Sequence, residues 1–108
     1  MSKIQVFAEY KIIPEKRQDY LDKIEQVSMA MEQIGVHDFD VYEGVDQPNL
    51  FVEMFHVPTV EAYEKIKRKR CDENAAPGVF WQTINDCIVG GTEKLHMWAF
   101  APIRREDA

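Results

Sequence analysis

The chain has 108 residues, of which 45% are hydrophobic and 30% charged, and its formal net charge is −6 at pH 7. We expect one domain, 1–108, small enough to leave much of its surface unburied, which favours association with a partner. The acidic balance argues against a nucleic-acid partner, because such binding depends on a basic face. Since no window approaches the roughly 20 apolar residues that span a bilayer, we expect no membrane association and a cytoplasmic location.

Residues 4–12 alternate between two faces, which is typical of a strand with one side in the core. The predicted core face holds Ile4, Val6, Ala8, Tyr10 and Ile12, and the opposite face holds Gln5, Phe7, Glu9 and Lys11. A helix is then predicted from Pro14, which suits a first helical position, to just before Gly35, which suits a left-handed helix end. Its buried stripe, spaced by threes and fours, comprises Tyr20, Ile24, Val27, Met31 and Ile34.

Two strand-like runs within residues 37–57 flank a polar turn, so we predict a hairpin there. We set its register by bringing apolar side chains together on the core face. This register pairs Phe39 with Met54, Val41 with Val52, Asp40 with Glu53, Tyr42 with Phe51, and His37 with His56.

After the hairpin, Thr59 suits the cap of a second helix over residues 60–70, in which Tyr63 and Ile66 would face inward. The outer face of this helix would carry two ion pairs, Glu61 with Lys65 and Glu64 with Arg68. A short extra helix over residues 79–88 and a last strand over residues 94–103 complete the chain. This order predicts an α+β ferredoxin-like βαββαβ fold with a four-stranded antiparallel sheet in the order 4-1-3-2.

The whole pattern resembles the dimeric α/β-barrel superfamily, and specifically its antibiotic-biosynthesis-monooxygenase-like and stress-responsive branches. The segments that carry the resemblance are "IQVFAEYKIIPEKRQDYLDKI", the hairpin end "VEMFHVPTVEAYEKI", the helix "FWQTINDCI" and the terminal "MWAFAPI". The resemblance implies a homodimer in which two four-stranded sheets pack face to face. It also implies pockets between each sheet and its helices.

Helices cover only one face of such a sheet, so the other face would be an exposed patch in a monomer. We expect this uncovered face to form the dimer interface through Phe7, Glu9, Tyr42, Phe51, Glu53 and Phe55, with Trp98 and Phe100 on the same side. Two like charges directly opposite each other, Asp40 and Glu53, are unfavourable unless a cation or a shared proton lies between them. Lys11, or a basic residue of the second subunit, is the expected cation.

Four residues are candidates for catalysis: His56, Tyr10, Tyr63 and Glu53. Glu53 and Glu9 on neighbouring strands could form an acid/base pair with raised pKa values, which would suit proton transfer from an acidic carbon. An interface network of salt bridges and water explains the same two carboxylates without any chemistry. We expect no metal site, because His37 and His56 have no evident third ligand.

A small flat molecule could be held by aromatic and apolar walls, for which the candidates are Trp81, Phe80, Ile66 and Trp98. A plain packed core is the alternative explanation of these residues. The resemblance implies a protein that binds a small aromatic or apolar molecule, and a monooxygenase-like enzyme that needs no cofactor and acts on a quinol-type substrate. The alternatives are a non-catalytic ligand-binding or stress-associated dimer, and a haem-binding protein with His56 as the iron ligand.

Overall fold

The structure is a computed structural model that describes residues 3–71 and 84–103. Its elements in chain order are β1 (Ile4–Lys11), η1 (Pro14–Lys16), α1 (Arg17–Gln33), β2 (His37–Glu43), β3 (Leu50–Val57), α2 (Val60–Cys71), η2 (Gly91–Lys94) and β4 (His96–Phe100). Of the predicted short helix over residues 79–88, residues 79–83 lie outside the described residues; Ile84 and Asn85 are helical, and Ile88 forms an isolated bridge with Ile12.

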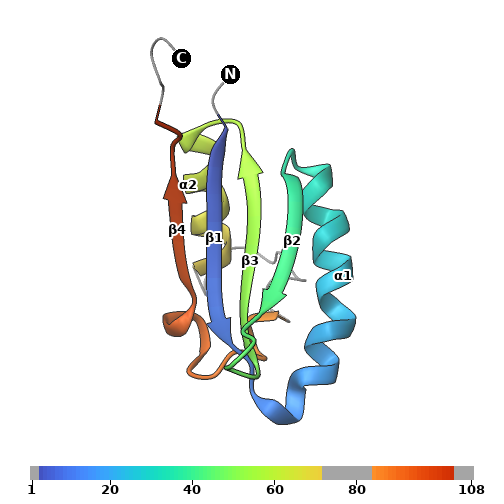
Figure 1. Ribbon diagram of the computed structural model, residues 1–108. Helices are drawn as coiled ribbons and strands as arrows, with labels where there is room; N and C mark the ends of the chain where they lie inside the picture. The colour runs from blue at the N-terminus through green and yellow to red at the C-terminus, as the bar shows by residue number, and fades with distance from the viewer. Residues whose placement is uncertain (1–2, 72–83, 104–108) are drawn as a thin grey trace.

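The four strands form one antiparallel sheet in the order β2-β3-β1-β4, which is the predicted order read from the other edge. Figure 1 shows α2 behind β1 and β4, and α1 running along β2. Residues of both helices are buried against the same face of the sheet, which we call the helix face; the opposite face is called the open face. The predicted α+β ferredoxin-like fold is therefore confirmed.

The first helix ends as its sequence predicts. Gly35 adopts a left-handed conformation with φ of +93°, which costs a residue without a Cβ little. Its N–H donates to the carbonyl of Glu32, and the N–H of Val36 donates to that of Met31, so the last turn is satisfied. Ile34, predicted to belong to the buried stripe, is 49% exposed because it follows the last helical residue.

The hairpin register differs from the predicted one. His37 lies opposite His56 as predicted, but Val41 lies opposite Glu53, one residue away from the predicted Val52. The difference arises at an irregularity between His37 and Asp40, where Asp38 has φ of +58°. An extra residue in one strand shifts every later pair by one position, and the alternation of the sequence does not report it.

The faces of β3 are consequently the reverse of those predicted. Phe51, Glu53 and Phe55 are buried on the helix face, opposite Tyr10, Ala8 and Val6 of β1. Their predicted place on the uncovered face is wrong. Both sets of alternate residues in this strand are largely apolar, so the pattern contained no strong signal for the choice. The open face instead receives Leu50, Val52, Met54 and His56.

The second helix begins as predicted, because the Thr59 hydroxyl oxygen accepts a hydrogen bond from the N–H of Ala62 at 3.0 Å. In this helix, Ile66 is buried and Tyr63 is half-buried. Neither predicted ion pair of the outer face, Glu61 with Lys65 or Glu64 with Arg68, forms within the described part of the chain.

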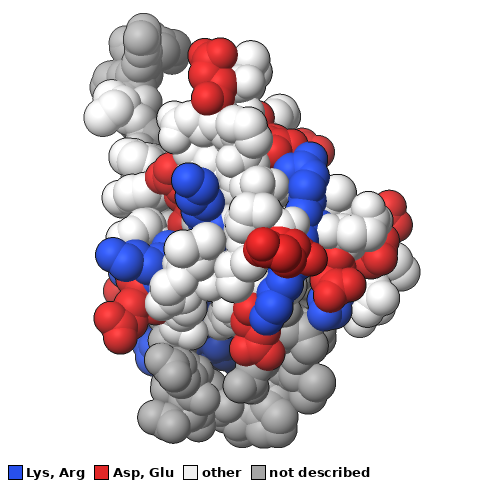
Figure 2. All heavy atoms as spheres, turned by 90° about the horizontal axis from the view of Figure 1, so that it is seen from below, with Lys and Arg blue, Asp and Glu red and all other residues white. Residues whose placement is uncertain are grey.

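Charged side chains of both signs lie on the surface of the molecule. Figure 2 shows acidic and basic side chains interspersed on the face seen from below, with no continuous basic area there. Among the described residues no helix is both long and apolar enough to cross a membrane.

Candidate functional site

Among the described residues, the helix face holds one buried ion pair. The carboxylate of Glu53, from the middle of β3, and the guanidinium of Arg70, from the last turn of α2, are both fully buried. Arg70 donates from Nη1 to Oε1 at 2.8 Å and from Nη2 to Oε2 at 2.9 Å. Such parallel bonds between a planar guanidinium and a carboxylate are among the stronger hydrogen bonds in proteins.

Two tyrosines extend this pair into a chain of hydrogen bonds. The hydroxyl of Tyr10, on β1, donates to Oε2 of Glu53 at 2.5 Å, and it lies 2.7 Å from the hydroxyl of Tyr20, on α1. The network therefore joins the sheet to both helices. We call these four residues, Tyr10, Tyr20, Glu53 and Arg70, the buried tetrad.

The tetrad is poorly suited to proton abstraction. Burial raises the pKa of Tyr10 well above its usual value, and the neighbouring charge of Glu53 raises it further. Burial also raises the pKa of Tyr20, again with help from Glu53. Both phenols stay protonated at neutral pH and act as hydrogen-bond donors, and the Glu53 carboxylate already accepts three hydrogen bonds.

Arg70 was missed by the sequence interpretation, which assigned the cation for Glu53 to Lys11 or to a second subunit. A signal for it was present, since Tyr63, Ile66 and Arg70 follow one another at spacings of three and four and so share one face of the helix.

The other predicted catalytic residues lie elsewhere. His56 is on the open face, where its Nδ1 lies 3.1 Å from a carboxylate oxygen of Asp38. Tyr63 is on α2, with its hydroxyl 3.5 Å from the carbonyl of Met97 in β4. The structure therefore brings together only Tyr10 and Glu53 of the four.

The predicted ligand walls are also divided. Ile66 is buried on the helix side, whereas Trp98 points from β4 onto the open face with 44% of its surface exposed. The expectation that these two residues line one pocket is wrong, because they lie on opposite faces of the sheet. Phe80 and Trp81 lie outside the described residues.

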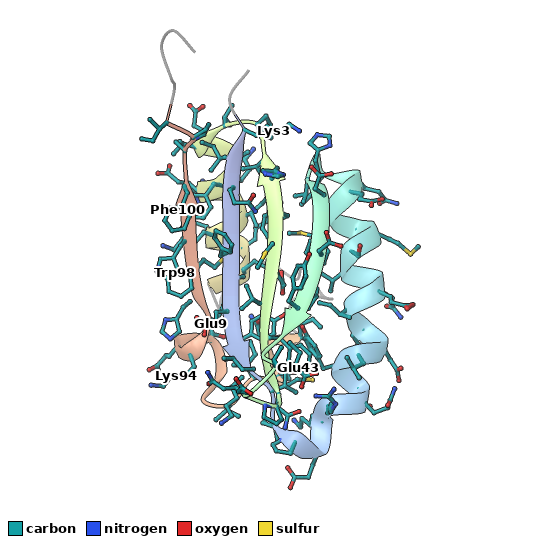
Figure 3. The ribbon with its side chains drawn as sticks, in the orientation of Figure 1. Lys3, Glu9, Glu43, Lys94, Trp98 and Phe100 are labelled. Atoms are coloured by element: carbon teal, nitrogen blue, oxygen red, sulfur yellow. The ribbon has the colours of Figure 1, made fainter. Side chains whose placement is uncertain are left out.

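The open face carries exposed aromatic side chains. Phe7 pairs with Trp98 across β1 and β4, and its ring meets that of Phe100 edge to face at 5.4 Å. Phe100 and Tyr42 are more than half exposed. Figure 3 shows Trp98 and Phe100 following one another along β4, with Glu9 on the neighbouring strand. Of the predicted interface residues, Phe7, Glu9 and Tyr42 do lie on this face.

A pocket of about 340 Å³ lies on the helix side, between the end of α1 and the first three turns of α2. Its apolar wall is formed by Ile34, Val57, Pro58, Ala62 and Ile66. Gly35 and Thr59 complete the lining, with the charged side chains of Glu61, Lys65 and Lys69. The pocket is separate from the buried tetrad, no member of which lines it.

Two further hollows lie on the open face. One, of about 410 Å³, is bordered by His56 and Phe100, and the other, of about 320 Å³, by Glu9, His96 and Lys94. Among the described residues, no three His, Cys, Asp or Glu side chains gather in a way that could hold a metal ion.

Comparison with known proteins finds relatives in structure only. No protein-family model matches the sequence, and no curated protein matches it either. Among solved structures, a "putative antibiotic biosynthesis monooxygenase" from Bordetella bronchiseptica superposes with a TM-score of 0.71 at 14% identity, covering 97% of this chain and 99% of the other. One of the same description from Deinococcus radiodurans has a TM-score of 0.66 at 18% identity, covering 94% of both chains.

A NIPSNAP family protein from Agrobacterium tumefaciens also superposes, with a TM-score of 0.60 at 14% identity, covering 94% of this chain and 86% of the other. At such identities the similarity establishes the fold and leaves the activity open. The predicted resemblance is thereby confirmed at the level of architecture: the chain has the ferredoxin-like α+β fold of antibiotic-biosynthesis-monooxygenase-like proteins.

Proposed function

We propose that the chain acts as a homodimer that binds a small, largely apolar molecule in the pocket on the helix side of each sheet. The observation that carries this proposal is the pocket itself, which opens between α1 and α2 and is walled by Ile34, Val57, Ala62 and Ile66. Ligand sites in proteins are typically concave, mostly apolar and from about 300 Å³ in volume, with a few polar groups at defined positions. This pocket meets that description at the lower limit of size.

The open face supports the homodimer. Phe7, Trp98, Phe100 and Tyr42 place aromatic side chains on a face of the sheet that no helix of the described residues covers. Exposed apolar patches of this kind usually mark an interaction site. A second copy of the same face is the occupant we propose, because acidic and basic groups are both present there, as Glu9 and Lys11, and a two-fold axis could bring unlike charges together.

An oxygenase reaction is a second candidate, favoured by the names of the proteins that share this fold. In a cofactor-independent reaction a bound phenol would reduce oxygen itself, so that phenol and O₂ give a quinone and water. The tetrad does not supply the base, since its phenols are protonated and its carboxylate is occupied. Activation would have to come from the pocket or from the substrate's own ionisation.

Binding can be tested by isothermal titration with 1-naphthol, a flat apolar probe that is also a phenol. We expect heat of binding from the wild type and none from Ala62→Phe, which places a ring in the pocket. Glu64→Phe, on an exposed position of the same helix that does not line the pocket, is the matched control and should bind like the wild type. Thermal unfolding would confirm that both variants are folded.

Equal binding by Ala62→Phe and the wild type, or no binding by either, would contradict the proposed site. Oxygen uptake during the same incubation tests the second candidate separately. If the protein binds 1-naphthol but the electrode records no oxygen consumption, oxygenation of this phenol is rejected. The proposal of a ligand-binding protein then stands without an oxygenase activity.

A further inference from the structure

The helix that borders the pocket presents charges to it at regular intervals. Glu61, Lys65 and Lys69 are spaced by four residues, so they follow one line along α2, and all three line the pocket. Their side chains are exposed, which places them at its mouth, while Ala62 and Ile66 lie deeper in the wall. The pocket therefore has an apolar interior and a mouth with one more positive charge than negative.

The two lysines at this mouth are not neutralised within the described part of the chain. Elsewhere in the described chain, Arg17 and Arg70 each bind a carboxylate. Neither Lys65 nor Lys69 lies within ion-pairing distance of a carboxylate of the described residues. Glu61, one turn before Lys65, does not pair with it. An unpaired ammonium beside an apolar wall favours a ligand that brings both a negative charge and an apolar body.

A third lysine of the same helix, Lys67, does not point toward the pocket as Lys65 and Lys69 do. The ammonium of Lys67 lies 5.8 Å from the centre of the Tyr63 ring, and the hydroxyl of Tyr63 points to Met97 in β4. Lys67 therefore faces β4 and does not line the pocket. It offers a natural control with the same charge on the same helix.

We propose that the pocket selects small molecules with an apolar body and a single carboxylate, which Lys65 and Lys69 bind at the mouth. This inference rests on the proposed function and adds the chemical class of its ligand. Glu61 contributes by orientation, since its negative charge at the other end of the row repels a carboxylate and directs it toward the two lysines. The apolar body then lies against Val57, Ala62 and Ile66.

The test compares 1-naphthoate with 1-naphthamide, which share a ring system and differ in charge. With the wild type at low ionic strength, isothermal titration should give a dissociation constant about tenfold lower for 1-naphthoate, as expected for two exposed charge contacts. The preference should weaken at high salt, because exposed charges are screened. The double variant Lys65→Gln/Lys69→Gln should lose the preference for 1-naphthoate, while Lys67→Gln should keep it.

Each outcome separates the two proposals. Equal affinity of the wild type for both probes would overturn the inference and leave the apolar pocket standing. A preference that persists in Lys65→Gln/Lys69→Gln would also overturn it, because the charge that recognises the carboxylate would lie elsewhere. Binding of neither probe, with both variants folded, would reject the inference together with the pocket.

Discussion

Glu53 is an acidic residue at the centre of an apolar strand, and its environment explains how it is accommodated. A buried carboxylate needs a paired charge and satisfied lone pairs, and Arg70 and Tyr10 provide both. A buried ion pair of this kind contributes little net stability compared with apolar residues of similar size, but removing one partner leaves the other as an uncompensated charge. The tetrad therefore fixes one arrangement of α2 against the sheet.

We predict that Arg70→Met lowers the free energy of unfolding by about 3–5 kcal/mol, because it leaves the Glu53 carboxylate buried without its cation. The double variant Glu53→Leu/Arg70→Met should recover most of this loss. Urea unfolding followed by circular dichroism would measure both. A loss below about 1 kcal/mol in Arg70→Met would show that the pair is not formed in solution.

The two phenols of the tetrad should make stability depend on alkaline pH. Because burial raises the pKa of Tyr10 and Tyr20 above the ordinary value of 10.0, the folded state holds these protons more tightly than the unfolded state does. Their contribution is complete below pH 10 and is lost as the pH rises further. We expect the free energy of unfolding to fall less steeply above pH 10 in Tyr20→Phe than in the wild type, and parallel curves would contradict this.

The periodicity of the sequence does not predict most of the contacts within the tetrad. The spacing of Tyr63, Ile66 and Arg70 predicts that Arg70 faces inward. Which carboxylate Arg70 then binds depends on which face of β3 is directed toward the helices. That face was predicted wrongly, so Glu53 was assigned to the dimer interface. The tyrosine pair depends on the packing of α1 against β1, which no local pattern specifies.

Secondary-structure elements were predicted more reliably than their registers. The strand β1, its core face and the end of α1 at Gly35 all follow from local spacing and turn chemistry, and the structure confirms them. The predicted helix start at Pro14 differs, because residues 14–16 form the 3-10 helix η1 and α1 begins at Arg17. The hairpin differs because a single irregularity beside Asp38 shifts the register of β2 against β3. Bulges are specified by backbone conformation and tertiary contacts, so they leave little trace in the alternation.

One cluster joins two elements at the turn of the hairpin. Arg17, in the first turn of α1, donates to both carboxylate oxygens of Glu43 in β2, at 2.6 and 2.8 Å. The side-chain oxygen of Asn49 accepts from Arg17, and the Asn49 N–H donates to Glu43. This cluster holds the start of the helix to the end of the hairpin.

The cluster predicts how stability responds to acid. The hydrogen bonds from Arg17, and then that from the Asn49 N–H, lower the pKa of Glu43 from 4.5 to about 2. Its contribution is present above pH 4.5 and is lost as the pH falls through about 2. Wild type and Glu43→Gln should therefore differ in urea midpoint above pH 5 and converge near pH 2, and a constant difference over this range would be inconsistent with the cluster.

At the scale of the molecule, the two faces of the sheet have different roles. The helix face is filled by an apolar core with the tetrad inside it, and the open face carries aromatic residues without a covering layer in the described part of the chain. The sequence correctly predicts that aromatic residues lie on the uncovered face. It wrongly assigns Phe51 and Phe55 to that face, where the structure has Val52 and Met54. The open face remains suited to a dimer interface, because Phe7, Trp98 and Phe100 lie on it.

We predict that the wild type sediments with twice the mass of one chain at micromolar concentration. Trp98→Lys, and Phe100→Lys two residues further along β4, should shift the protein to the monomer, because a charge within an apolar interface is costly to bury. Val45→Lys, in the exposed hairpin turn, is the control and should remain dimeric. Identical sedimentation profiles for the wild type and all three variants would contradict the assignment of the open face.

The central claim, that the molecule binds its ligand on the helix side and its partner on the open face, is tested most directly by mapping a bound probe. Amide chemical shifts of the ¹⁵N-labelled protein would be recorded during titration with 1-naphthol. The largest changes should fall at Gly35, Ala62 and Ile66, and little should change at Phe7 and Trp98. Changes centred on Phe7 and Trp98, or no changes at saturating probe, would contradict the account.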